Sequence, residues 1–222
     1  MSVSTISSEL LKRPDLPLVM AEVHRQLTEE ADRRRAFREW LDEDKKAEFI
    51  NGEVIMHSPV KSVHLAISDK LSLLINVYIR KHKLGRLMIE KALISLTRND
   101  YEPDLAFFRQ EVAETFDDDQ MLFPAPDFVV EILSKSTAKY DRGIKLIDYA
   151  SHGVREYWII DPTREIVEQY LRIGDDEAFM PPSKLHIGHT VSSKAISGFE
   201  IPVEAIFRND ACEEALSILL AS

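Results

Sequence analysis

The chain has 222 residues, and 28 Lys and Arg against 38 Asp and Glu give it a net charge of −10. Hydrophobic residues at 45% and charged residues at 30% are typical of a globular domain and exclude a disordered or collagen-like chain. The acidic balance argues against a protein that coats nucleic acid by bulk electrostatics, although an enzyme with a local basic patch remains compatible with it. The single cysteine, Cys212, excludes an internal disulfide, and no apolar run is long enough for a membrane span, so we expect a cytoplasmic protein.

The first predicted element is a long helix over residues 16–46. Apolar residues recur with the helical period at Val23, Leu27 and Ala31, and Phe37 and Trp40 continue the same stripe. The other face carries four arginines, which we interpret as a solvated helix face rather than a nucleic-acid patch. These arginines are Arg33, Arg34, Arg35 and Arg38.

A β-hairpin is predicted around Asn51-Gly52, because a type I′ turn needs two residues that tolerate positive φ. With this turn, Phe49 faces Val54 and Ala47 faces Met56, and we expect this apolar side to meet the core. The other side mixes apolar and polar residues and is predicted to line a site. Its members are Glu48, Ile50, Glu53, Ile55 and His57.

The rest of the chain alternates between helical and strand periods. It predicts, in order, a helix over 62–80, strands over 87–96 and 105–108, an exposed acidic loop over 111–120, a strand over 128–133, a helix over 137–152, a strand over 154–160, short strands over 165–171 and 191–201, and a helix over 213–220. A strand, a helix and a strand at the spacing of 128–160 predict a parallel crossover. The fold class is therefore α/β: a mixed sheet flanked by helices, with an N-terminal helix and hairpin and small C-terminal β additions.

Two carboxylates stand out in this arrangement. Glu131 interrupts the apolar strand FVVEIL, where an unpaired charge would be costly, and Asp104 begins a strand directly after Pro103. Each residue alone has a structural interpretation, as an ion-pair partner or a turn residue. Together, carboxylates on neighbouring strands suit Mg²⁺, which prefers oxygen ligands and lowers the pKa of a bound water.

Lys145 is the candidate for stabilising negative charge on a reacting phosphate. It follows Asp141 by four residues, so the two share a helix face, and we expect its ammonium to reach inward from the edge of the core. An exposed helix salt bridge is the alternative. Lys145 belongs to a basic cluster with Lys135, Lys139 and Arg142, and a second cluster covers residues 80–91. Either cluster could hold a phosphate backbone.

Other motifs give little support to competing functions. His186 and His189 have a spacing compatible with zinc, but no third ligand is identifiable, and Tyr157 and Trp158 are interpreted as core residues. The sequence contains no GxGxxG motif and no P-loop, so a nucleotide cofactor is not expected.

The segments YEPDLAFF and PDFVVEILSKSTAKYDRGIKLIDYASHGVREYWIIDP resemble the Uma-two family of restriction endonucleases, within the PD-(D/E)XK nuclease superfamily. The resemblance covers roughly residues 48–207, since EFINGEV is similar to the opening hairpin of the family and IPVEAIF to its closing segment. It implies a restriction-endonuclease-like fold over 47–208, preceded by an N-terminal helical extension over 1–46. A C-terminal helix over 209–222 is expected to pack on the same domain.

The resemblance also implies roles for individual residues. Asp104 and Glu131 would be metal ligands together with the backbone carbonyl of Ile132, and Glu48 would be a further metal or water ligand. The lysine that the superfamily places two residues after the acid is absent, because position 133 is Leu, and Lys145 would take its role with Lys135 as the fallback. Candidate substrate contacts are His64, Lys135, Lys139 and Arg142.

These implications give a metal-dependent DNA endonuclease that uses Mg²⁺, or Mn²⁺ as a substitute, to activate a water. A homodimer is expected, with each subunit cutting one strand. The alternative is a degenerate nuclease fold that binds nucleic acid or protein without hydrolysis, favoured by the missing strand lysine and the charge of −10. A third hypothesis is a nuclease inhibited by its acidic loop over 111–120.

Overall fold

The structure is a computed structural model that describes residues 3–42, 44–174, 176 and 178–221. Its helices are α1 (Val3–Leu11), α2 (Leu16–Trp40), α3 (Ser62–His82), α4 (Gln110–Ala113), α5 (Ala138–Asp141), α6 (Ile144–Ser151), α7 (Glu204–Phe207) and α8 (Asn209–Ala221). Its strands are β1 (Ala47–Ile50), β2 (Glu53–Met56), β3 (Gly85–Ile89), β4 (Leu93–Ser95), β5 (Asp100–Tyr101), β6 (Leu105–Arg109), β7 (Leu122–Phe123), β8 (Phe128–Ile132), β9 (Glu156–Asp161), β10 (Ile166–Leu171), β11 (Ser183–His186), β12 (Thr190–Ser192) and β13 (Glu200–Pro202).

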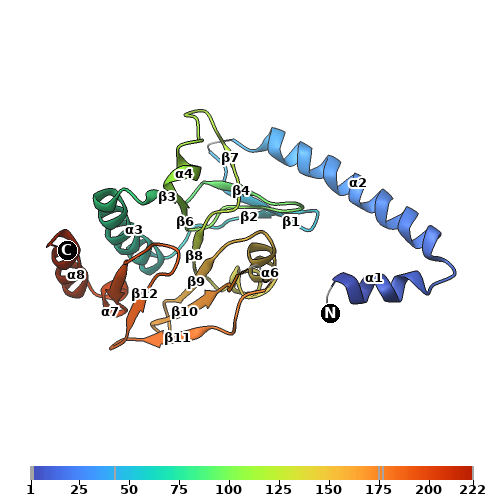
Figure 1. Ribbon diagram of the computed structural model, residues 1–222. Coiled ribbons are helices and arrows are strands. Elements are labelled where there is room, and N and C mark those ends of the chain that lie inside the picture. The colour runs from blue at the N-terminus through green and yellow to red at the C-terminus, as the bar shows by residue number, and fades with distance from the viewer. Residues whose placement is uncertain (1–2, 43, 175, 177, 222) are drawn as a thin grey trace.

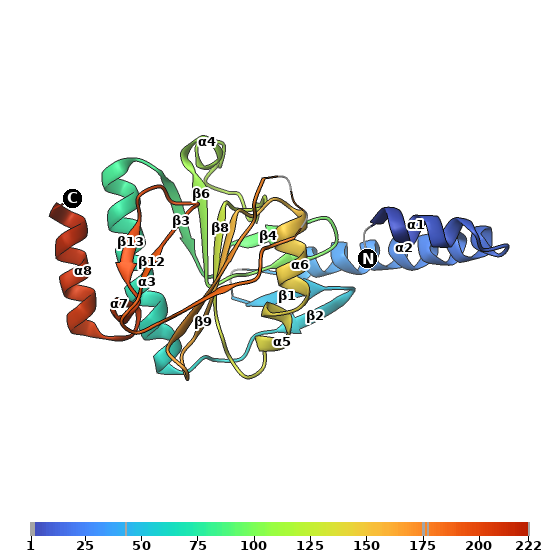
Figure 2. The same ribbon diagram turned by 60° about the horizontal axis from the view of Figure 1, so that its bottom comes forward.

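The predicted α/β fold with a mixed sheet is confirmed. The central sheet has the strand order β11-β10-β9-β8-β6-β3, and β8 and β9 are parallel, as the predicted crossover requires. A smaller sheet has the order β2-β1-β5-β4-β7, and β12 pairs with β13. Figure 2 shows α3 and α8 side by side on one side of the central sheet and α6 on the other.

Two apolar cores cover the faces of the central sheet. On the α3 side, Leu71 and Leu74 pack with Trp158 of β9, and α7 and α8 close this core. On the α6 side, Tyr149 packs with Tyr157 of β9. The short, almost continuous apolar strands β8 and β9 fit this burial on both faces. Ile147 of α6, although apolar, is 65% exposed.

The N-terminal helix is shorter and less covered than its apolar stripe predicts. It ends at Trp40, and α1 and α2 project from the body of the molecule (Figures 1 and 2). Phe37 is buried against Phe49, whereas Val23 and Leu27 are each 43% exposed. The stripe therefore packs on the hairpin sheet only in the second half of α2. Positions 1–2 and 43 of the predicted extension, and position 222 of the predicted C-terminal segment, lie outside the described residues.

The interpretation of the arginine face as solvated was wrong for two of its four residues. Arg34 and Arg38 each donate two hydrogen bonds to the carboxylate of Asp100, which is completely buried. A buried carboxylate needs such charged donors, and Asp100 lies far from both arginines in the sequence. These two ion pairs fix α2 to β5.

The hairpin has the predicted register, with Phe49 opposite Val54 and Ala47 opposite Met56. The expectation that this whole side meets the core was half wrong. Ala47 and Phe49 are fully buried, but Val54 and Met56 on the edge strand β2 are 45% and 57% exposed. An edge strand has a neighbour on one side only, which explains why its apolar residues stay uncovered.

Three predicted elements are divided in the structure. The strand over 87–96 splits into β3 and β4, which join different sheets, because Glu90 and Lys91 adopt positive φ. The segment 191–201 forms the two strands β12 and β13 rather than one. The helix over 137–152 breaks at Gly143 into α5 and α6, and a Cβ there would lie 2.6 Å from the carbonyl oxygen of Lys139. Beyond these, α1, α4, α7, β5, β7 and β11 were not predicted.

None of the helices in the described part of the chain combines the length and apolarity needed to cross a membrane.

Candidate active site

Seven of the nine predicted site residues, all except Glu48 and Lys139, line one cavity of about 640 Å³ at the end of β8. Its lining comes from the end of β2 and the following loop, the start of α3, the segment after β8 and the turn after β9. The lining includes His57, Lys61, His64, Glu102, Asp104, Glu131, Ile132, Lys135, Arg142 and Lys145. Segments distant in the sequence therefore supply one site.

Asp104 and Glu131 are neighbours across the strand pair β6–β8. Leu105 pairs with Val130 in this antiparallel ladder, so the preceding Asp104 stands opposite the following Glu131. One oxygen of Asp104 accepts a hydrogen bond from the backbone amide of Ile132 at 2.7 Å. The other lies 3.0 Å from Nε2 of His64. The two carboxylates are only 6% and 5% exposed, and they form the floor of the cavity.

Lys145, in the first turn of α6, lies at the same floor. Its Nζ is 2.8 Å from an oxygen of Glu131, 2.8 Å from an oxygen of Glu48 and 3.4 Å from an oxygen of Asp141. Lys145 is 1% exposed, so it is buried rather than at the edge of the core, where we expected it. The exposed salt bridge considered as the alternative is also wrong, because Asp141 is equally buried.

Asp141 is a member of the cluster that the sequence analysis did not assign to the site. Neither of its oxygens has a hydrogen-bond partner, although Lys145 is close to one of them. The spacing of four residues between Asp141 and Lys145 was the available signal. This spacing indicated only that the two residues share a helix face, because a local pattern does not show which face of a helix is buried.

The cluster places three carboxyl groups around one ammonium. Burial raises the pKa of Glu131 well above its usual value, although the nearby Lys145 opposes this. Burial also raises the pKa of Glu48, but the charge of Lys145 and a contact with His57 outweigh it and bring that pKa down to about 2. Burial lowers the pKa of Lys145, and Glu131, Glu48 and Asp141 outweigh it, so the net shift is upward. Lys145 is thus held in its charged form, whereas burial favours the protonated form of Glu131.

This donor set fits a divalent cation. Mg²⁺ is usually held by one or two carboxylates while it keeps several waters, and Asp104 and Glu131 offer two adjacent carboxylates at a cavity floor next to Ile132. An added cation would also favour the ionised form of Glu131, which burial disfavours. Within the described residues, no group of three His, Cys, Asp or Glu side chains converges in the manner of a fully protein-enclosed metal site.

The predicted substrate contacts occupy different positions. His64 is 6% exposed and is held against Asp104, with its Nδ1 unpartnered. Lys135 is exposed at the mouth of the cavity, and Arg142 lines it while pairing with Glu168 at 2.7 Å. Lys139 is not among the lining residues, and its ammonium lies over the ring of Tyr140. His64 therefore positions a carboxylate, whereas Lys135 and Arg142 border the cavity entrance.

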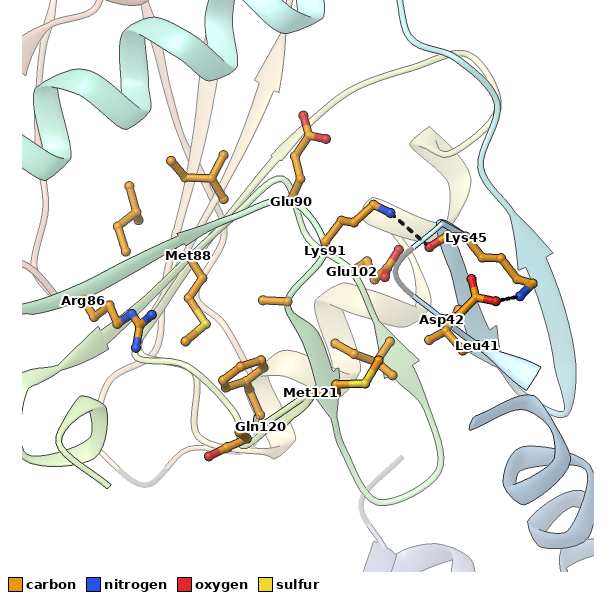
Figure 3. Close-up of a pocket in the computed structure, with 15 residues that line it drawn as sticks. Leu41, Asp42, Lys45, Arg86, Met88, Glu90, Lys91, Glu102, Gln120 and Met121 are labelled. Atoms are coloured by element: carbon orange, nitrogen blue, oxygen red, sulfur yellow. Dashed lines mark hydrogen bonds and ion pairs between the residues drawn. The ribbon is translucent and has the colours of Figure 1, made fainter. Parts of the chain in front are cut away.

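A second cavity of about 460 Å³ lies between β3, β4 and the segment that follows α2. Figure 3 shows Arg86, Met88 and Met121 on its wall. Glu102 lines both this cavity and the candidate site. Burial raises the pKa of Glu102 to about 7, and its Oε2 has no hydrogen-bond partner.

The acidic loop over 111–120 lies away from the candidate site. It follows the last residue of β6, whereas Asp104 precedes the first, so the two are at opposite ends of that strand. The described residues that line the site cavity include none from this loop. Its Phe116 packs against Phe108 and Phe123. The structure therefore gives no support to inhibition by this loop.

Comparison with known proteins decides the family. The model of the Uma2 family, described as "Putative restriction endonuclease", matches residues 13–204. The chain belongs to this family. An uncharacterized protein of Synechocystis sp. is 29% identical over 133 residues, which are 59% of this chain and 75% of that protein.

Solved structures agree with this assignment at the level of the fold. The crystal structure of a protein from Anabaena variabilis, described as a putative nuclease belonging to DUF820, superposes with a TM-score of 0.67 at 18% identity. The match covers 79% of this chain and 96% of that one. The restriction-endonuclease-like fold of this Uma2 member, expected from its sequence motifs, is confirmed.

Proposed function

We propose that this Uma2 protein is a metal-dependent DNA endonuclease, with Mg²⁺ as its metal and Mn²⁺ as a substitute. The observation that carries the proposal is the pair of buried carboxylates Asp104 and Glu131, opposite each other at the floor of a cavity, with Lys145 bound to Glu131. The family supports a nuclease. A divalent metal at such a pair supplies a water of lowered pKa and polarises a phosphoryl oxygen.

Within this proposal, each side chain has a distinct task. Asp104 and Glu131 hold the metal together with the carbonyl of Ile132. Glu48 forms an ion pair with Lys145 and accepts a hydrogen bond from the backbone amide of Glu102 at 2.9 Å. It therefore helps to hold the residues of the cavity floor in place. Lys145 positions Glu131 and supplies positive charge below the reacting phosphate. Lys135 and Arg142 contact the DNA backbone at the entrance.

The proposal also covers the oligomeric state of the protein and its location in the cell. We propose a cytoplasmic homodimer, with domain limits at residues 46 and 208. The exposed apolar residues on the first half of α2 offer an interface between two copies. Neither the dimer nor these limits is needed for the site, since its residues all come from one chain.

A non-hydrolytic binding module is the second candidate. The observation in its favour is that one oxygen of Glu131 is already occupied by Lys145, while the lysine two residues after Glu131 is missing. Such a module would bind DNA without turnover in Mg²⁺ or Mn²⁺.

Plasmid nicking by the wild type and by Asp104→Asn distinguishes these functions. In EDTA, the melting temperature of the isosteric variant should be close to that of the wild type. The variant should lose Mg²⁺- and Mn²⁺-dependent nicking. Equal nicking by both proteins would show that the site is wrongly assigned. No turnover in either protein, with retained DNA binding, would favour the module.

A further inference from the structure

The proposed metal ligands lie deep in the cavity rather than on an open surface. Asp104 is 6% and Glu131 is 5% exposed, and the cavity of about 640 Å³ has the size of a pocket for a small ligand. A phosphate that reaches this floor must enter the cavity together with its own nucleotide. In a stacked and paired strand, that movement costs the unstacking and unpairing of the nucleotide.

One wall of the cavity is apolar although it faces solvent. Met56, Val60 and Val63 line it, and they are 57%, 39% and 45% exposed. Met56 ends β2 and Val63 lies in the first turn of α3, so two separate elements bring these side chains to one wall. Apolar side chains next to a phosphate site suit the face of an unstacked base, which sheds water on contact.

Basic side chains surround the entrance. Lys61, Lys135 and Arg164 line the cavity and are exposed. The lining carboxylates Glu102, Asp104 and Glu131 are buried, and Asp161 is partly buried 3.9 Å from Arg164. Positive charge at the rim attracts the phosphates on either side of the one that enters, and the negative floor is left for a cation. This division of charge resembles the groove of a protein that follows a single strand, where basic residues track the backbone and apolar surfaces receive bases.

We infer that the strand that enters this cavity is unpaired DNA, either a single strand or the splayed arm of a duplex. This inference rests on the proposed nuclease function and specifies its substrate. The burial of the floor disfavours a stacked duplex strand, the apolar wall suits a base, and the basic rim suits the flanking phosphates.

The test compares three end-labelled DNAs of the same sequence: a single strand, a blunt duplex, and a duplex with two unpaired arms. Cleavage in Mg²⁺ is measured at one fixed salt concentration, because phosphate contacts make affinity salt-dependent. Asp104→Asn protein serves as the control for contaminating nucleases. Binding of the same DNAs to Asp104→Asn protein is measured by fluorescence anisotropy, so that recognition is read independently of turnover.

We expect the single strand and the splayed arms to be cut at least about tenfold faster, and bound more tightly, than the blunt duplex. Cleavage of the blunt duplex at an equal or higher rate would overturn the inference and leave the nuclease proposal intact. No cleavage of any DNA would overturn the nuclease proposal. In that case, tighter binding of the single strand would still support the cavity as a site for unpaired DNA, and equal or tighter binding of the duplex would overturn it.

Substitutions on the wall test the contact with bases. Val63→Ser and Val60→Ser should each weaken single-strand binding by about threefold to tenfold, with little effect on duplex binding. Leu73→Ser is the matched control, because Leu73 is 42% exposed on the same helix and is not among the lining residues. Equal losses in the Val63 and Leu73 variants, or equal losses for both kinds of DNA, would contradict a base-receiving wall.

Discussion

The ammonium of Lys145 lies 2.8 Å from an oxygen of Glu131, and both side chains are buried at the floor of one cavity. The same ammonium also contacts Glu48 and Asp141, so a single positive charge holds three carboxylates together. The geometry of the proposed metal ligands therefore depends on a residue from the helix after the strand, rather than on a lysine of the strand itself.

Removal of this ammonium should destabilise the protein in a way that a metal can reverse. Lys145→Met leaves three buried carboxylates without their counter-charge, which should cost about 3 kcal/mol at pH 7. Mg²⁺ should then raise the melting temperature of the variant more than that of the wild type, because the cation replaces the lost charge. Thermal melting with and without Mg²⁺ measures both effects. Lys139→Met, at an exposed lysine of α5, is the control. A variant that melts like the wild type would show that Lys145 is not needed to hold the cluster.

His64 should act by positioning Asp104. Its Nε2 is 3.0 Å from the carboxylate, and loss of such a partner of a metal ligand typically costs about 10- to 100-fold in metal affinity or activity. His64→Ala should therefore raise the Mg²⁺ concentration needed for half-maximal cleavage by about tenfold. His64→Gln can still donate a hydrogen bond to Asp104 and should restore most of the affinity. If the alanine variant keeps the Mg²⁺ dependence of the wild type and loses only DNA affinity, His64 is a substrate contact instead.

The ion pairs of Asp100 should make stability sensitive to acid. Burial raises the pKa of this carboxyl, but hydrogen bonds from Arg34 and Arg38 outweigh it and lower the pKa below its usual value. Because the folded pKa is the lower one, this contribution is complete above the unfolded pKa of about 3.9 and is lost as the pH falls through the folded pKa. Asp100→Asn should cost about 3 kcal/mol at pH 7, since it leaves two arginines without their carboxylate partner.

Urea unfolding of the wild type and of Asp100→Asn between pH 7 and pH 3 checks this sign. The difference in free energy of unfolding should be constant near neutrality and shrink below about pH 4. A difference that grows toward acid pH would refute the assignment. Asp32→Asn is the control, because Asp32 forms an exposed ion pair with Arg35 on the same helix.

The acidic loop should affect stability rather than activity. Simultaneous replacement of Asp117, Asp118 and Asp119 by Asn removes three charges at the far end of β6 and should leave the cleavage rate within about twofold, since charges beyond a Debye length are largely screened. Phe116→Ala removes a ring packed between Phe108 and Phe123 and should cost about 3 kcal/mol. Cleavage assays and thermal melting separate the two outcomes. A large rise in cleavage in the triple variant would revive inhibition by the loop.

Features with a local physical cause were predictable from the sequence. Asn51-Gly52 specifies the hairpin and its register because both residues tolerate positive φ. The apolar runs of β8 and β9 predict strands covered on both faces, since apolar residues on both sides of a strand require two cores. Glu131 was predicted to have a partner because a carboxylate within such a run needs one, and Lys145 is that partner.

Only the tertiary structure decided which charged groups meet. Asp100 pairs with Arg34 and Arg38 across more than sixty residues, and Asp141 joins Glu131 around Lys145. Ion pairing depends on distance in space, and it leaves no periodic signal along the chain. The local period of α2 and of the α5–α6 segment therefore indicated helices correctly. The packing of the strands and helices decided which side of each helix is buried, and which charges are buried with it.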